Sequence, residues 1–333
     1  MSGCAYLVDR ASLARMNPTH ALRLSAKPAA RSAVDARWLG VLFVLGAVAC
    51  FSGLDTTSKA LGAMPVMMLV WFRYVTQASV TALAQWPRRG RALLETRHPW
   101  LHALRGLLIL STSVCTNLAL RAMPVGELTA IVMLTPLLMT LIGATFLHER
   151  VSPGRWSLIV AAFGGALLVA KPGAGMWSWG LLMALLALAL NTGFHLVTSR
   201  LSRTEDVGTM QFLTGCTGAL AATLVLPLFW TPLGAWSTWA LLALVCVFST
   251  AGHWMLIVGY AKAGIATLTP LLYAQIAFST LLGWLVFAHV PDALALAGIA
   301  IITLAGAACT WLSAREREQA RGLAALEDAS MEH

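Results

Sequence analysis

The most constraining feature of this sequence is a series of apolar runs that recur from Trp38 to Leu312. Each is long enough to cross a bilayer as a helix, which takes roughly 20 mostly apolar residues. Of the 333 residues, 58% are hydrophobic and only 11% are charged, a balance that is foreign to water-soluble domains of this size. The sequence therefore predicts an all-α membrane protein in which lipid takes the place of water as the main solvent.

Ten transmembrane helices can be placed on these runs. Prolines and short polar segments separate them, as expected where a helix has to end. The fifth expected span is the shortest of the ten. In chain order the spans are 38–58, 64–86, 100–120, 126–147, 155–170, 177–199, 207–230, 236–260, 264–288 and 292–313.

The basic residues are distributed unevenly over the segments between these spans. If the N-terminus lies in the cytoplasm, all but five of the 23 lysines and arginines fall in cytoplasmic segments. Lys59, Arg121 and Lys171 fall in the opposite loops, and Arg73 and Arg105 fall inside spans. Membrane proteins concentrate Lys and Arg in cytoplasmic loops. The pattern predicts a multi-pass protein of the bacterial inner membrane with both termini cytoplasmic. The net charge of +9 then reflects topology, and no nucleic-acid partner is expected.

The two ends of the chain are predicted to be cytoplasmic tails, at 1–37 and 314–333. Residues 1–37 are rich in arginine, and no apolar segment with a cleavage site precedes Trp38, so we expect a disordered tail there. Met16 is a second candidate start. The six cysteines form no CxxC pattern and are expected to be small buried side chains, so neither a metal nor a cofactor is predicted.

The chain contains a weak internal repeat. When the sequence is shifted by 140 residues, Leu128 aligns with Leu268, Thr129 with Thr269 and Gly143 with Gly283. This divides the spans into five-helix halves at 38–170 and 177–313. Because five is odd, the second half would cross the membrane upside down relative to the first. Two inverted repeats of this kind are a recurring architecture of secondary transporters.

The segments "ALRAMPVGELTAIV" (119–132) and "GYAKAGIATLTPLLY" (259–273) resemble the two domains of the EamA family, within the drug/metabolite transporter superfamily. The resemblance covers most of 38–313. "GLDTTSKAL" (53–61) followed by "PVMMLVWFRYV" (65–75) is similar to the branch that includes carriers of riboflavin, S-adenosylmethionine and metallophores. The chain departs from the family pattern at His289, where members commonly have an acidic residue. The resemblance implies transport of a small organic metabolite.

Asp55 and Arg73 are the strongest candidate site residues, because a charge inside the bilayer is costly and is usually functional. Their expected depths bring them within reach of each other, and Lys59 lies one helical turn from Asp55 on the same face. Two interpretations are open. The three residues form a clamp of the Asp-Lys or Asp-Arg type that fixes the first hairpin, or they line a cavity that binds substrate or carries a proton.

Several polar residues in other spans are secondary candidates. His195, with Asn191 one turn before it, and His253 titrate near physiological pH and are suited either to proton coupling or to hydrogen bonds between helices. Pro270 and the Thr135–Pro136 pair should loosen the ninth and fourth spans, where discontinuous helices often form a substrate site. Further candidates for substrate contact or helix packing are Tyr273, Gln275 and Asn117.

Together these features predict a secondary transporter that works by alternating access. Its expected partners are a small-molecule substrate, the lipid bilayer and, if transport is coupled, protons. Exposed faces of small residues are also compatible with a homodimer. The alternatives are an integral-membrane enzyme or a non-transporting membrane scaffold. No Walker loop, HExxH, GxSxG or Rossmann motif supports an enzyme.

Overall fold

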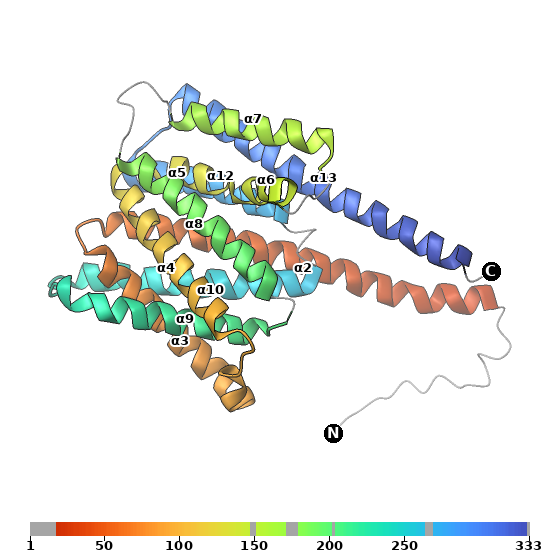
Figure 1. The fold of residues 1–333 in the computed structure, drawn as a ribbon, viewed down its shortest axis with the longest axis horizontal. Coiled ribbons are helices and arrows are strands. Elements are labelled where there is room, and N and C mark those ends of the chain that lie inside the picture. Colours follow the sequence, from red (N-terminus) through yellow and green to blue (C-terminus); the bar gives the residue numbers. More distant parts are fainter. Residues whose placement is uncertain (1–17, 147–150, 171–178, 202–203, 264–268, 332–333) are drawn as a thin grey trace.

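The computed structural model describes residues 18–146, 151–170, 179–201, 204–263 and 269–331, and every regular element in these ranges is a helix (Figure 1). In chain order the elements are α2 (Pro18–Ala60), α3 (Val66–Arg89), η1 (Gly90–Leu93), α4 (Pro99–Ala122), α5 (Val125–Val132), α6 (Thr135–Phe146), α7 (Pro153–Ala170), α8 (Trp179–Leu201), α9 (Val207–Val225), η2 (Leu226–Leu228), α10 (Trp236–Ala263), η3 (Thr269–Tyr273), α12 (Ala274–Phe287) and α13 (Ala293–Met331).

Eight helical stretches in the described residues are long and apolar enough to cross a membrane. Two shorter apolar helices, Pro153–Val169 and Leu271–Phe287, coincide with the expected fifth and ninth spans. The chain is therefore an all-helical, multi-pass membrane protein with eight candidate spans of full length.

The first helix starts earlier than the sequence predicts. We expect a disordered tail over 1–37, yet α2 begins at Pro18 and continues without interruption into the first span. Residues 18–37 contain alanine, leucine and arginine and no glycine, so a helix nucleated by the span can propagate through them, and α2 continues past Pro28 with one backbone donor missing. Residues 1–17 lie outside the described part. At the other end of the chain, α13 likewise runs on to Met331.

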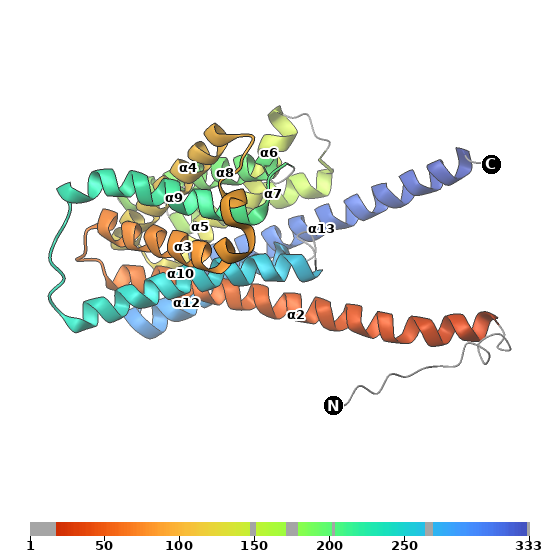
Figure 2. The same ribbon diagram turned by 90° about the horizontal axis from the view of Figure 1, so that it is seen from below.

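Both extended helices project from the same end of the bundle, here called the terminal end (Figures 1 and 2). The opposite end, called the loop end, carries the connections α2–α3, α4–α5 and α9–α10. Within the bundle, α2 packs against α10, α4 against α8, α3 against α9 and α7 against α13. The shorter α12 packs against both α2 and α5. Small residues permit the close approaches, since an added Cβ at Gly53 would lie 3.0 Å from the Phe248 ring.

The expected fourth span is interrupted. α5 ends at Val132 and α6 begins at Thr135, because Pro136 has no N–H to donate to the Val132 carbonyl. The Thr135 hydroxyl donates to that carbonyl instead (2.7 Å), and it accepts a bond from the Asn191 side-chain amide of α8 (3.0 Å). A second change of helix type occurs where η3 joins α12. The α-helical structure is thus interrupted beside both Pro136 and Pro270, as the sequence predicted.

Candidate functional site

Four ionisable side chains from different helices lie inside the bundle: Asp55 of α2, Arg73 of α3, His195 of α8 and His253 of α10. Surrounding protein strongly desolvates Asp55, His195 and His253. Even so, Asp55, Arg73 and His253 are half-buried rather than buried, and His195 is exposed. Arg73 acts electrostatically on Asp55 and His253, and the Arg105 guanidinium of α4 acts on both histidines, so these side chains belong to one interior polar region, here called the interior site.

Asp55 and Arg73 interact without forming a closed pair. Arg73 is the charged group that acts on the Asp55 carboxylate. Within the described residues, however, no ion pair of 4.0 Å or less joins the two. The Arg73 Nε atom is buried and has no hydrogen-bond partner among those residues. The expected proximity of the two side chains is therefore observed, but the Arg73 guanidinium keeps donor capacity for another group.

Lys59 does not join this pair. Its ammonium group donates to the carbonyl oxygens of Leu120 (2.7 Å) and Met123 (2.5 Å), at the C-terminal end of α4. The last carbonyls of a helix lack partners within the helix and carry partial negative charge, so they attract a cation. Of the two clamps considered from the sequence, the Asp55–Lys59 clamp is wrong because the long side chain extends toward the loop end.

Arg105 of α4 is a buried charged residue that the sequence analysis left without a role. It is 6% exposed, and its guanidinium donates to Thr198 (2.8 Å), to the Met210 carbonyl (2.9 Å) and to Thr214. The guanidinium also lies 4.7 Å from the centre of the Phe194 ring. All of these partners are uncharged, so the positive charge of Arg105 is retained inside the bundle. The signal that selected Arg73, a charge within an apolar span, applies equally to Arg105.

The two histidines make local contacts. The His253 Nδ1 atom lies 2.7 Å from the Ser249 carbonyl of the same helix, and a carbonyl only accepts, so Nδ1 is the donor. The ring meets Phe51 of α2 edge-on at 5.0 Å. His195 contacts the neighbouring Phe194 ring at 5.3 Å. Arg105 acts electrostatically on both histidines, which places them within the field of the same buried charge.

Tyr273 and Gln275 serve helix packing in this conformation. Tyr273 is 1% exposed and fills a space beside Gly306 of α13, where an added Cβ would lie 2.2 Å from the ring. Gln275 is buried, and its backbone carbonyl accepts a bond from the Ser52 hydroxyl of α2 (3.1 Å). Neither side chain is accessible from the interior site.

The two asparagine candidates are also engaged in structural contacts. Asn117 donates to the Ser113 carbonyl one turn earlier in α4 (2.8 Å). Asn191 donates to Thr135 at the α5–α6 break. The sequence identified polar residues in the right helices, but the structure brings only some of them to the interior site.

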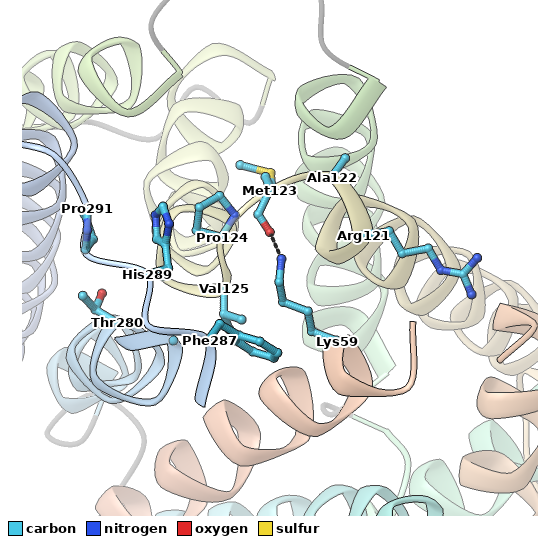
Figure 3. Close-up of a pocket in the computed structure, with 12 residues that line it drawn as sticks. Lys59, Arg121, Ala122, Met123, Pro124, Val125, Thr280, Phe287, His289 and Pro291 are labelled. Atoms are coloured by element: carbon cyan, nitrogen blue, oxygen red, sulfur yellow. Dashed lines mark hydrogen bonds between the residues drawn. The ribbon is translucent and has the colours of Figure 1, made fainter. Parts of the chain in front are cut away.

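A pocket of about 320 Å³ opens at the loop end (Figure 3). Figure 3 shows Lys59 extending to the Met123 carbonyl, with the Phe287 ring beside it and His289 farther away. The His289 Nε2 atom lies 3.7 Å from a Glu127 carboxylate oxygen, which would form an ion pair with a protonated ring. Glu127 lies in the first turn of α5, where a carboxylate is favoured. An acidic group is thus present beside the position where the family pattern led us to expect one, although it comes from another helix.

Polar contacts join the helices at the terminal end, from the exposed Arg89–Asp206 pair to the buried Glu205 side chain. Asp206 caps the start of α9 by accepting from the backbone N–H of Gly208 (2.7 Å), and it forms an ion pair with Arg89 of α3. The Arg89 hydrogen bond lowers the pKa of Asp206. Next to it, Glu205 accepts from the Thr96 hydroxyl (3.0 Å) and from the Arg97 N–H (2.9 Å). These contacts join the α3–α4 connection to the start of α9.

Comparison with known proteins places this arrangement in a family. The model of the EamA-like transporter family matches residues 38–171. A riboflavin transporter of Rhizobium johnstonii is 30% identical over 280 residues, which are 82% of this chain and 89% of the relative. The chain belongs to the EamA-like transporter family. The family resemblance predicted from the sequence is confirmed.

Other relatives of this EamA-like transporter have different named substrates. A pseudopaline exporter of Pseudomonas aeruginosa is 27% identical, over 80% of this chain and 94% of the relative. An S-adenosylmethionine uptake transporter of Rickettsia conorii is 24% identical, over 79% of this chain and 89% of the relative. One protein of known crystal structure shares the fold, with a TM-score of 0.60 and 22% identity over 84% of this chain and 98% of that one. The relatives are all small-metabolite transporters, and their names include both uptake and export.

Proposed function

We propose that this EamA-like transporter is a secondary carrier that moves a small organic metabolite across the bacterial inner membrane by alternating access. The observation that carries the proposal is the interior site, where Asp55, Arg73, His195 and His253 are enclosed by protein and still accessible. Such a site suits a solute that enters from one face and leaves from the other. Charges inside the membrane are energetically costly, and a non-transporting scaffold would not require them.

The pairing of the helices supports two inverted halves, at 38–170 and 177–313. If α5 with α6 and η3 with α12 each count as one span, exchanging the halves replaces α2 by α8 and α10 by α4. The observed pair α2–α10 then becomes the observed pair α8–α4, while α3–α9 and α7–α13 are each converted into themselves. The break at Met133 also lies 140 residues before Tyr273, the same offset as the sequence repeat. This symmetry favours ten spans with both termini on one side of the membrane, and the distribution of Lys and Arg favours the cytoplasmic side.

The inverted arrangement gives the carrier two conformations of similar energy, because each half can adopt the conformation of the other. Within it we assign the interior residues Asp55, Arg73, His195 and His253 to substrate binding or coupling. Lys59, Asn117, Asn191, Tyr273 and Gln275 are assigned to helix packing. Asp55 and His253 are the candidates for carrying a proton, and dimerisation through small-residue faces is compatible with this scheme.

The proposal is tested by solute exchange in liposomes. Purified protein is reconstituted into vesicles loaded with one of the compounds named for the relatives, namely riboflavin, S-adenosylmethionine or a metallophore, or with an organic acid. We expect counterflow of labelled solute for at least one compound, and loss of this exchange in Arg73→Ala. Binding of a compound without any exchange would contradict a carrier.

The role of Asp55 is tested in the same vesicles. Asp55→Asn preserves the shape of the side chain but cannot gain or lose a proton. If Asp55 carries the coupling proton, counterflow at equal pH persists in the variant while accumulation driven by a pH gradient is lost. Full retention of gradient-driven accumulation would remove Asp55 from the coupling mechanism.

A further inference from the structure

The interior of the described bundle carries more positive than negative charge. Arg73 and Arg105 contribute two guanidinium groups, and Asp55 is the single carboxylate that the described residues place between the two ends of the bundle. Two other acids flank this region. Glu127 lies at the loop end, and Glu205 lies at the terminal end, 3.8 Å from the Nε2 atom of His102, which is one turn before Arg105 in α4. The histidines add positive charge if they protonate and none if they do not.

Arg73 and Arg105 differ in their hydrogen-bond partners and in their charged neighbours. The Nε and Nη1 atoms of Arg105 donate three hydrogen bonds to hydroxyl and carbonyl oxygens, and none of these acceptors is charged. Arg73 has the opposite arrangement, since Asp55 acts on its charge from beyond ion-pair distance while its buried Nε atom has no hydrogen-bond partner in the described chain. A buried donor without a partner is energetically unfavourable. The Arg73 site therefore lacks a hydrogen-bond acceptor for its Nε atom among the described residues.

We propose that the interior site takes a small organic anion whose carboxylate or phosphate group binds the Arg73 guanidinium. This inference rests on the proposed transport function and specifies its substrate class. The planar guanidinium presents paired N–H donors that match a carboxylate or phosphate. Asp55 competes for the same cation, which weakens binding enough for the anion to leave, as transport requires. A cationic solute would instead be repelled by the Arg73 guanidinium.

Binding of matched compounds tests the charge preference. Full-length protein in detergent is titrated by calorimetry with riboflavin 5′-phosphate and with riboflavin, and separately with phenylacetate, phenylacetamide and phenethylamine. Each set shares a skeleton and differs in charge. We expect the anionic member of at least one set to bind about tenfold or more tightly than its neutral counterpart, the effect of a hydrogen bond to a charged group. Equal affinities within both sets, tighter binding of the neutral or cationic members, or no anion binding at all would overturn the inference.

Variants at Arg73 connect the preference to this side chain. Arg73→Gln should reduce the affinity of the preferred anion about tenfold and leave that of its neutral counterpart unchanged, whereas Arg73→Lys should retain most of the preference. Arg88→Gln, which removes an exposed charge from the same helix, is the matched control and should bind as the unaltered protein does. The melting temperature of each variant without ligand shows that it is folded. An undiminished anion preference in folded Arg73→Gln would contradict the assignment.

Failure of this inference can be told apart from failure of the carrier model. Exchange of neutral or cationic solutes only, in reconstituted vesicles, would leave the transporter in place and reject the anionic substrate. Tight, Arg73-dependent binding of an anion that never exchanges would support the site and reject transport.

Discussion

Two adjacent glycines of α7 have opposite surroundings. Gly165 is buried against α13, where an added Cβ would lie 2.9 Å from the Gly298 carbonyl oxygen and 3.0 Å from the Ile301 side chain. At Gly164, which is exposed, an added Cβ would meet nothing within 4 Å. Only Gly165 is therefore required for the close packing of α7 against α13.

We predict that Gly165→Ala destabilises the protein by about 1–3 kcal/mol, because the helices must move apart to admit the methyl group. Gly164→Ala should be neutral or stabilising by up to about 1 kcal/mol, since alanine is the better helix former. Thermal unfolding in detergent, followed by tryptophan fluorescence, measures both variants. Equal shifts in melting temperature would refute the packing argument.

The Arg89–Asp206 ion pair should contribute stability that depends on pH. Because Arg89 lowers the pKa of Asp206 in the folded protein, the contribution is present above the ordinary aspartate pKa of about 4 and is lost as the pH falls through the lowered value. The two side chains are 42% and 44% exposed, so solvent screening keeps this contribution small.

The matched variant for this pair is Asp206→Asn. Asparagine still caps α9 but has no charge, so we expect slightly lower stability at neutral pH and a smaller loss of stability on acidification than in the unaltered protein. Chemical unfolding measured from about pH 6 down to about pH 3 gives the comparison. An identical acid dependence in both proteins would show that the pair contributes nothing.

At the scale of elements, the break between α5 and α6 depends on one missing donor. In Pro136→Ala the N–H of residue 136 can donate to the Val132 carbonyl, so α5 and α6 should merge into a continuous helix. Stability should stay equal or rise, while counterflow in liposomes should fall several-fold if the break allows the halves to rearrange. Pro153→Ala is the control, because a proline in the first turn of α7 replaces no helical hydrogen bond. If both variants exchange solute at similar rates, the α5–α6 break is not needed for transport.

The sequence predicted the helical, membrane-spanning character of the chain and the breaks at the prolines, but not the length of the first helix. Proline acts locally, since it removes a donor from its own helix, so Pro136 can be interpreted without knowledge of the fold. The stretch from Pro18 to Arg37 has the arginine-rich composition of a tail and also the propensity of a helix. This stretch is helical rather than disordered because it continues directly from a membrane span, and a helix that is already formed extends at little cost.

For the whole molecule, the proposed topology predicts which loops face outward. In a variant free of native cysteines, Ala235→Cys at the loop end should react with a membrane-impermeant maleimide in intact cells. Glu95→Cys at the terminal end should react only after the membrane is opened. Both positions are exposed, so the orientation of the protein alone determines the difference. Labelling in the reverse pattern would mean that the termini lie outside.

The sequence by itself determined the all-helical, membrane-embedded fold, because a backbone in lipid must satisfy its hydrogen bonds within each helix. It also marked Asp55 and Arg73, since a charge in an apolar span stands out without any structure. Only the tertiary structure decided which residues these polar side chains bind. Lys59 caps a helix end 61 residues away, and Ser52 bonds to a carbonyl 223 residues away. Such contacts depend on which helices pack side by side, and apolar faces of similar composition do not specify that choice locally.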